Sequence, residues 1–246
     1  MSPSRKRKNA VARVRPFSIA IVLIVICAGV GLYYATKWPL FYPRHITVTG
    51  TSVVTKEEVV QRAALDPYRN IWLQNIGAAA SRIAAIPYVR TVQIRRKLPA
   101  FVTIAIEERK PFAIVEDGVT RVVIDDQLHI LPIDAALTDL PQLRSQPIEA
   151  ASVGKRLMSA QLAQLVRDCK ALVHASVPVA YMNLDKVGNL NARLRSGIVV
   201  EFGDDSDVAA KARLVNPVLS QVAPKGRKVR ALDLRAAKTP VLVYVR

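Results

Sequence analysis

The first candidates for chemistry are carboxylates that stand side by side in the chain, at Glu107-Glu108, Asp125-Asp126 and Asp204-Asp205. Two carboxylates that converge on one bond could serve as the acid/base pair of a glycoside hydrolase. Glu107 and Glu108 lie in an alternating run, and neighbours on a strand point to opposite faces of the sheet. The two aspartate pairs fall at predicted turns, where aspartate is typical because it makes local hydrogen bonds. We therefore expect none of the three pairs to be catalytic.

Other motifs for catalysis or metal binding are incomplete. Residues 152–156 contain a lone Gly-Lys pair but lack the first glycine and the preceding strand of a phosphate-binding loop, and no G-x-S-x-G or S-x-x-K motif is present. The three histidines are isolated, and Cys27 and Cys169 form no C-x-x-C pair. We expect a protein that is not an enzyme and has no catalytic residue, cofactor, metal site or small-molecule substrate.

A basic cluster, Arg95-Arg96-Lys97, raises the alternative of nucleic-acid binding. The 246-residue chain has 36 Lys and Arg against 19 Asp and Glu, a formal net charge of +17, which favours an anionic partner. Aromatic residues are only 6% of the chain and do not alternate with basic ones, which counts against binding to single-stranded nucleic acid. Two alternating runs flank the cluster, so it fits a hairpin turn whose charges lie in water.

The N-terminal part of the chain predicts a membrane anchor. Residues 17–35 carry no charge over 19 positions, close to the roughly 20 apolar residues that span a bilayer. Six basic and no acidic residues lie within residues 1–16, which places the N-terminus in the cytoplasm and the remainder, with a formal charge of +11, outside. The alternative is a cleaved signal peptide, whose apolar core is shorter and ends in small residues, whereas this run ends in Leu32-Tyr33-Tyr34. Chromosomal DNA, ATP and NADH are absent outside the membrane, so we expect no nucleic-acid partner.

The exported part begins, after a linker at residues 36–43, with a small domain predicted over residues 44–113. His45–Gly50 alternates like a half-buried strand, Thr55 and Glu58 make a capping box, and residues 75–86 have apolar side chains at helical spacing. Two further strands flank the basic cluster. The order β-α-α-β-β predicts a three-stranded sheet backed by two helices.

The remaining residues, 114–246, predict a C-terminal mixed α/β domain with an antiparallel sheet. Short strands flank the turn at Asp125-Asp126, one helix runs through residues 162–173, and a second follows Asp207. The chain ends in Leu232–Arg235 and Val241–Arg246, which should form a hairpin about residues 236–240. The fold class is therefore α+β, with a single N-terminal transmembrane helix.

These segments resemble the FtsQ/DivIB family of bacterial cell-division proteins, which implies an FtsQ-type POTRA domain followed by a β domain. In the first half the resemblance rests on "ITVTGTSVVTKEEVV" and "IPYVRTVQIRRKLPAFVTIAIEERKPFA", with a V-x-G strand end at Gly50 and an E-R-x-P-x-A exit that starts at Glu108. In the second half it rests on "RVVIDDQLHILPID", "LPQL" and the terminal "LDLR". Gln127 or Leu128 stands where the family often has a turn glycine, which leaves the turn type open.

The resemblance implies an essential-type, non-catalytic scaffold that links division proteins at the septum. It would lie in the bacterial inner membrane with a cytoplasmic N-terminus and exported domains, and would bind small coiled-coil partners of the FtsB/FtsL type and other membrane proteins of the division machinery. Ala236 and Ala237 stand where the family often has an aromatic residue, which shifts the expected contact toward Val241–Tyr244. The predicted partner-binding residues lie in the terminal hairpin and are Leu232, Leu234, Arg235, Val241, Val243 and Tyr244.

The alternative function is an exported, membrane-anchored protein that binds or processes the cell wall, held there by its positive charge. The terminal strand separates the two hypotheses. "VLVYV" is apolar and free of proline, so as an edge strand it could accept another chain. A wall-binding protein would instead be expected to show repeated modules or aromatic sugar platforms.

Overall fold

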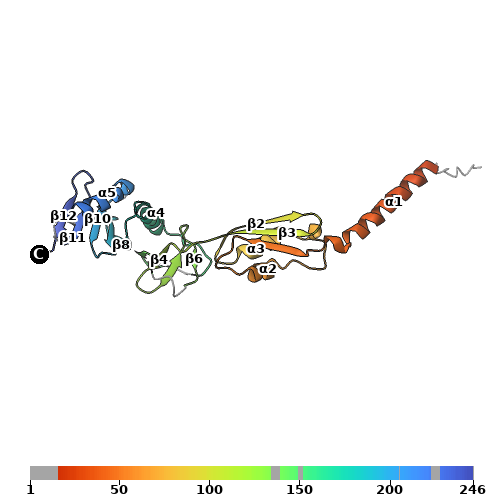
Figure 1. Ribbon diagram of the computed structural model, residues 1–246, viewed down its shortest axis with the longest axis horizontal. Helices are drawn as coiled ribbons and strands as arrows, with labels where there is room; N and C mark the ends of the chain where they lie inside the picture. The colour runs from red at the N-terminus through yellow and green to blue at the C-terminus, as the bar shows by residue number, and fades with distance from the viewer. Residues whose placement is uncertain (1–15, 134–138, 149–151, 205, 223–227, 246) are drawn as a thin grey trace, which may run out of the picture.

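The computed structural model of the chain describes residues 16–133, 139–148, 152–204, 206–222 and 228–245. An apolar helix, a small domain and a larger domain follow one another along the long axis of the molecule (Figure 1). The six basic residues of the predicted cytoplasmic tail lie outside the described residues. We call the elements from β1 to β3 the first domain and those from β4 to β12 the second domain.

The predicted anchor forms one continuous helix, α1, over Pro16–Thr36. Its segment Ile19–Thr36 has a mean hydropathy of 2.3, and no residue of that segment is buried against the rest of the protein. A helix that is apolar on every side must be covered by something other than water. By length and composition, α1 can cross a membrane.

The first domain has the predicted β-α-α-β-β order, with one short 3-10 turn, η2, added between its helices, while a second such turn, η1, precedes β1. The elements are η1 Pro39–Phe41, β1 His45–Thr49, α2 Lys56–Ala63, η2 Ile71–Leu73, α3 Ile76–Ala84, β2 Val89–Lys97 and β3 Phe101–Glu108. The sheet order is β1-β3-β2, with β1 parallel and β2 antiparallel to β3. Both helices are capped as their sequences suggest, because Thr55 Oγ1 accepts from the Glu58 amide (3.2 Å) and Asn75 Oδ1 from the Ala78 amide (3.0 Å).

The alternation of β2 and β3 buries one face of the sheet. Val102, Ile104 and Ile106 point into the core, whereas the residues between them are exposed. Arg95 and Lys97 lie on the exposed face, as predicted. The prediction that the whole basic cluster lies in water is wrong for Arg96, which is half-buried and donates to the carbonyls of Ile71 (3.1 Å) and Trp72 (3.2 Å).

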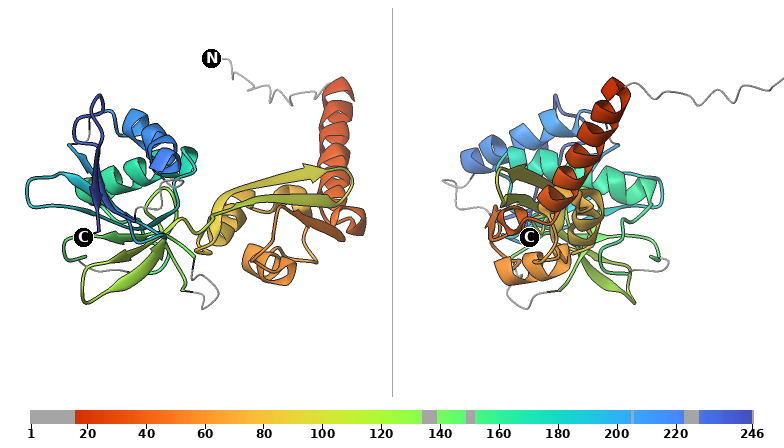
Figure 2. Two further views of the ribbon diagram at one scale, coloured as in Figure 1. Left: turned by 60° about the vertical axis from the view of Figure 1, so that its left-hand side comes forward. Right: turned by 90° about the vertical axis from the view of Figure 1, so that its right-hand side faces the viewer.

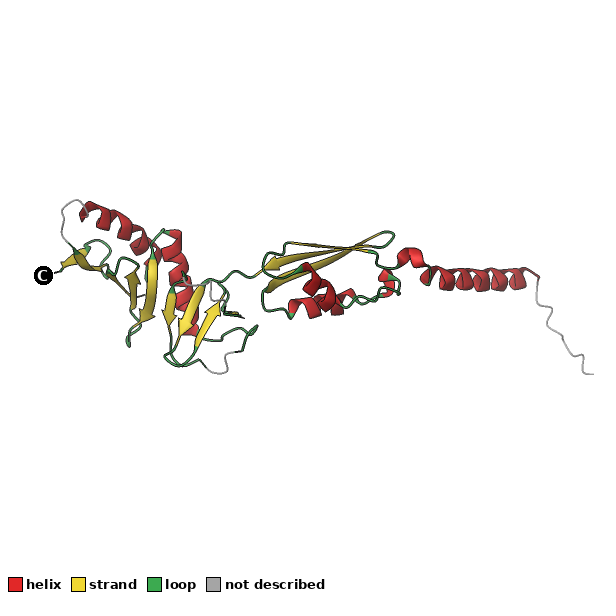
Figure 3. Ribbon diagram, turned by 60° about the horizontal axis from the view of Figure 1, so that its bottom comes forward, coloured by secondary structure: helices red, strands yellow, loops and turns green. Residues whose placement is uncertain are grey.

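The second domain is a nine-stranded sheet in the order β12-β11-β10-β9-β8-β7-β4-β5-β6. Two helices, α4 and α5, cover one face of it (Figures 2 and 3). The strands are β4 Ala113–Glu116, β5 Arg121–Ile124, β6 Ile130–Leu131, β7 Gln142–Arg144, β8 Val179–Leu184, β9 Leu190–Leu194, β10 Val199–Gly203, β11 Val229–Asp233 and β12 Val241–Tyr244. The helices are α4 Ala160–His174 and α5 Val208–Val222. The main core lies between the sheet and these helices.

The α+β fold is confirmed, but the second sheet is mixed and not purely antiparallel as predicted. Most neighbouring strands run antiparallel, but β10–β11, β4–β7 and β7–β8 are parallel. Parallel neighbours need a crossover connection, usually a helix. Helix α4 connects β7 to β8 and α5 connects β10 to β11, so the two predicted helices account for two of the parallel pairs.

The turn type that the sequence left open is decided at Leu128. Its φ is +69°, the left-handed region in which glycine is the usual residue. Asp125 stabilises this turn, because its Oδ1 accepts from the amides of Gln127 and His129, both at 2.8 Å. The carboxylate thus supports a conformation that leucine rarely adopts.

Candidate partner-binding site

The adjacent carboxylates Glu107 and Glu108 point in opposite directions, as predicted. Glu107 is exposed and accepts from Thr91 Oγ1 (3.2 Å). Glu108 accepts from the backbone amides of Val53 (3.0 and 3.1 Å) and Val54 (2.8 Å). Burial alone would raise the pKa of Glu108, but the amides of Val53, Ser52 and Val54 outweigh it and hold the pKa below its ordinary value. Glu108 therefore anchors a loop and does not act as a proton donor.

The loop that Glu108 holds begins at Gly50, the last residue of the V-x-G motif. Gly50 has φ +83°, and a Cβ there would lie 2.0 Å from the carbonyl oxygen of Ile106 on β3. Only glycine allows the chain to pass this close to the neighbouring strand. The glycine of the V-x-G motif and the glutamate that starts the E-R-x-P-x-A motif therefore both have a role in holding the first domain together.

The two domains are joined by a group of ion pairs that we call the interdomain clasp, made of Arg90, Arg109, Asp125, Asp126 and Lys170. Arg109 donates to the fully buried Asp125 carboxylate (2.7 Å). Arg90 from β2 and Lys170 from α4 both bond to Asp126, Lys170 at 3.1 Å. The clasp links the domain next to α1 to the domain that carries the terminal hairpin.

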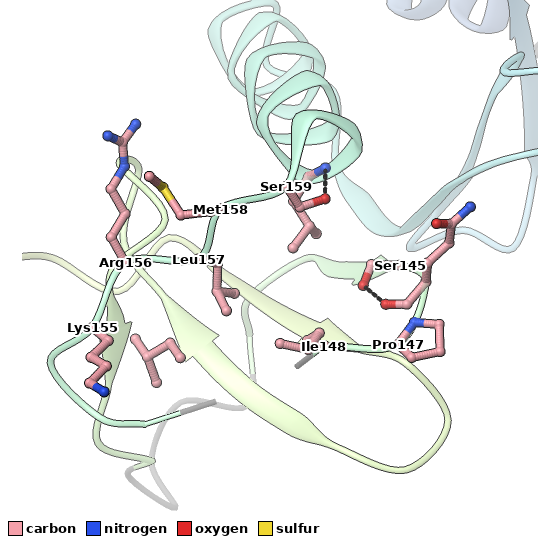
Figure 4. A pocket seen from close by; sticks show the side chains of 11 residues that line it. Ser145, Pro147, Ile148, Lys155, Arg156, Leu157, Met158 and Ser159 are labelled. Atoms are coloured by element: carbon pink, nitrogen blue, oxygen red, sulfur yellow. Dashed lines mark hydrogen bonds between the residues drawn. The ribbon is translucent and has the colours of Figure 1, made fainter. Parts of the chain in front are cut away.

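A pocket of about 420 Å³ lies beside the start of α4 (Figure 4). Its two serine hydroxyls are used locally, because Ser145 donates to the Gln146 carbonyl (2.6 Å) and Ser159 accepts from the Leu162 amide (3.3 Å). Among the described residues that line it, none is a histidine or carries a carboxylate. Within the described parts of the chain, no group of three His, Cys, Asp or Glu side chains could hold a metal ion.

The terminal hairpin forms at one edge of the sheet, but its first strand is β11 Val229–Asp233 and not the predicted Leu232–Arg235. β11 and β12 pair antiparallel, with Ala231 opposite Val243 and Asp233 opposite Val241. In the part of the chain that the structure describes, no strand pairs with the outer side of β12. The Val245 amide donates to the Lys228 carbonyl (2.9 Å), so by alternation the Val243 peptide group points to β11 and the Leu242 peptide group to the open edge.

The predicted site residues divide between the core and the surface. Leu232 and Leu234 are fully buried in the core of the second domain, so their side chains face away from the open surface. Val241 and Val243 are about half exposed, at 54% and 45%, and point away from the helices. Tyr244 is half-buried and lies on the same side of the strand as Leu242, which packs on the core.

Arg235 lies at the turn end of the hairpin and has partners within the chain. Its guanidinium donates to both oxygens of Asp233 (2.6 to 3.1 Å), and its Nε lies 3.8 Å from Glu201. This guanidinium holds the pKa of Asp233 below its ordinary value. The sequence reasoning overlooked Asp233, Glu201 and Val245, although the alternation of "VLVYV" could have identified Val245, which is also exposed.

Comparison with known proteins adds two family matches. A family model described as "POTRA domain, FtsQ-type" matches residues 41–109, and one described as "Cell division protein FtsQ/DivIB, C-terminal" matches residues 113–235. The chain is 26% identical to cell division protein FtsQ of Streptomyces coelicolor, over 97% of this chain and 91% of the relative. It is 24% identical to cell division protein DivIB of Clostridium tetani, over 92% and 86% respectively.

Proposed function

Because the chain belongs to the FtsQ/DivIB family of cell-division proteins, we propose that it is a membrane-anchored scaffold that docks partner chains at the division septum. The family resemblance read from the motifs is confirmed by both matches, and the first domain is an FtsQ-type POTRA domain. The chain therefore takes part in cell division. The scaffold role, the partners and the docking site are the proposal.

The open edge of β12 is the observation that carries the proposal. An edge strand leaves alternate N–H and C=O groups without a neighbouring strand, and an extended peptide can satisfy them by strand addition. The Leu242 peptide group would pair with the added strand, and Val241, Val243 and Val245 would supply apolar contact beside it. Arg235 would bind a carboxylate of the partner only if its guanidinium were shared between that carboxylate and Asp233.

The proposed partner is an extended, exported segment of a small coiled-coil division protein of the FtsB/FtsL type. This choice follows from the family membership. Other membrane proteins of the division machinery would be held nearby through the same scaffold. The side chains of Leu232 and Leu234 would act indirectly, since they are buried and fix β11 against the core.

We further propose that α1 is an uncleaved anchor in the bacterial inner membrane, with residues 1–16 in the cytoplasm. The proposed boundaries are 17–35 for the membrane segment, 36–43 for the linker, 44–113 for the POTRA domain and 114–246 for the β domain. The basic residues before α1 support this orientation. A reporter that is active only outside the cytoplasm should work when fused after Arg246, and a mature chain that begins near Ala35 would contradict the anchor.

The docking site is tested by titrating the full chain in nanodiscs with the exported segment of the FtsB-type partner. We expect Val243→Lys to weaken binding by at least about tenfold, because a lysine on an edge strand opposes strand pairing. Val187→Lys is the matched control, since Val187 is 86% exposed in the β8–β9 turn and should leave binding unchanged. Proline at Val243 is less suitable, because the amide there points to β11.

A second variant, which lacks residues 241–246, should abolish binding while the POTRA domain stays folded. If this shortened chain and Val243→Lys both bind as tightly as the intact protein, the edge-strand mechanism is wrong. The interface would then have to be sought on the POTRA domain.

A further inference from the structure

The end of the POTRA domain next to α1 carries an exposed surface that partner docking at β12 does not use. Both η2 and the β2–β3 turn lie at this end (Figures 1 and 3). We call this surface the membrane-facing tip, and it consists of four apolar side chains that are 39% to 64% exposed and two exposed basic ones: Trp72, Leu73, Leu98, Phe101, Arg95 and Lys97.

The chain connectivity keeps the tip close to the membrane surface. Helix α1 ends at Thr36 and β1 begins at His45, so even a fully extended connection reaches at most about 30 Å. The connection is shorter than that, because it contains η1 and because the Tyr42 hydroxyl donates back to the Lys37 carbonyl (3.1 Å). The His45 ring stacks on Phe101 with their centroids 5.1 Å apart, which joins the tip directly to the start of β1.

Trp72 is held in place at the tip by three separate contacts. The guanidinium of Arg96 lies 5.0 Å from the centroid of the indole ring, and it also donates to the carbonyl of Trp72 (3.2 Å). The indole Nε1 donates to the carbonyl of Pro99 in the β2–β3 turn (3.3 Å). The tryptophan and the turn therefore form one ordered surface that stays exposed in the folded protein.

The composition of the tip matches the surface of an anionic bilayer. The two segments that carry these six side chains, residues 68–75 and 93–103, contain four basic residues and no acidic one. Tryptophan is enriched at the level of lipid headgroups, where its ring is half in water. Clustered lysine and arginine are attracted to anionic lipids, and that attraction is added to the apolar contact. A site that binds a water-soluble anion would not need the exposed apolar side chains of Leu73, Leu98 and Phe101.

We propose that the membrane-facing tip docks onto the anionic phospholipid headgroups of the leaflet from which α1 emerges. Trp72 and Leu98 enter the headgroup region, and Arg95 and Lys97 contact the phosphates. Because the molecule is elongated and the terminal hairpin lies at its far end (Figure 1), this contact fixes the height and direction of β12 above the membrane. The inference does not depend on the identity of the division partner.

The test uses the full chain with Trp38→Phe, which leaves Trp72 as the only tryptophan. This protein is reconstituted into vesicles of phosphatidylcholine with brominated acyl chains, with or without phosphatidylglycerol. We expect the Trp72 fluorescence to shift to shorter wavelength and to be quenched in the vesicles that contain phosphatidylglycerol. High salt should reverse much of this effect, because it screens exposed charges.

Charge reversal provides the specific control. Arg95→Glu together with Lys97→Glu should remove most of the quenching, since each basic residue near an anionic surface strengthens binding by about fivefold. Lys186→Glu together with Arg193→Glu reverses two exposed charges in the other domain and should leave the quenching unchanged. Thermal unfolding of both double variants checks that they remain folded.

Three results would overturn the proposal. Trp72 that stays unquenched in both vesicle types would show that the tip does not reach the membrane. Quenching that is the same with and without phosphatidylglycerol, and the same in both double variants, would show that the connection to α1 alone brings Trp72 near the bilayer. Shielding of Trp72 that appears only when a second division protein is added would assign the tip to a protein partner instead.

Discussion

At the scale of single residues, Glu108 and Arg109 show how two neighbours in one motif can serve different domains. Glu108 turns back to the amides of Val53 and Val54 within the POTRA domain. Arg109 reaches forward to Asp125 in the second domain. Glu108 is the last residue of β3 and Arg109 is the first residue after it, so the two side chains can extend in different directions.

The pH dependence of stability tests the role of Glu108. The pKa of Glu108 is lower in the folded protein than its ordinary value, so its stabilising effect is complete above that ordinary value and is lost as the pH falls through the folded pKa. At neutral pH, Glu108→Gln should lower the free energy of unfolding by about 1–2 kcal/mol, because the amides of Val53 and Val54 lose a charged acceptor. In strongly acidic solution the two proteins should converge.

Chemical denaturation of the full chain in detergent at several pH values measures this difference. Glu107→Gln is the matched control, because Glu107 is exposed and should change stability by less than about 0.5 kcal/mol at any pH. A loss at Glu108→Gln that does not vary with pH would contradict the assignment of the charge to the two amides.

At the scale of elements, the β2–β3 hairpin gives the three adjacent basic residues two different roles. Arg95 and Lys97 point to water, while Arg96 points back to η2. The pleat of a strand alternates side chains between the two faces, so the middle residue of the cluster must face the helices. Its long aliphatic stem lets the charge reach two carbonyls at the margin of the core.

Substitutions in the hairpin test this division of roles. Arg95→Gln and Lys97→Gln should each change the free energy of unfolding by no more than about 0.5 kcal/mol. Arg96→Gln should cost about 1–2 kcal/mol, because two carbonyls lose a charged donor and the indole of Trp72 loses its cation. Thermal unfolding gives the ranking, and equal losses at Arg95 and Arg96 would show that the assignment of faces is wrong.

At the scale of the whole molecule, the interdomain clasp sets how the anchor and the terminal hairpin are related. The anchor and the edge strand lie at opposite ends of an elongated chain (Figure 1). Arg109 and Asp125 are the most buried pair of the clasp, at 13% and 0% exposure of their side chains. A buried charge that loses its partner is strongly destabilising, so this pair is the sensitive point of the joint.

Arg109→Gln should lower the stability of the full chain by about 3 kcal/mol, because it removes the nearest cation from the buried Asp125 carboxylate and leaves only the more distant Arg90, 3.9 Å away, to balance its charge. The matched control is Arg195→Gln, whose pair with Asp139 is exposed and should contribute at most about 1 kcal/mol. Calorimetry of both variants measures the difference. If the two substitutions have the same small effect, the clasp does not hold the domains together.

The sequence by itself was sufficient to predict most secondary-structure elements of both domains and to identify the family. Most of the strands and helices formed where the periodicity and the turn residues predicted them, because these signals are local, but β11 lies at Val229–Asp233 and not at the predicted Leu232–Arg235. The uncharged run formed a single helix for the same reason. In the site, the alternation of Val241 and Val243 was also local, and both side chains are exposed.

Only the tertiary structure decided which contacts join distant parts of the chain. Among the strands that the structure describes, sheet order left β12 with one neighbour, and packing of the second domain buried Leu232 and Leu234, which the sequence had suggested as contact residues. The pleat placed Arg96 on the face toward the helices, but only the packing of η2, some 25 residues earlier, brought the carbonyls that it binds within reach. Such pairings depend on how whole elements pack, and no local periodicity specifies which distant segment will lie alongside.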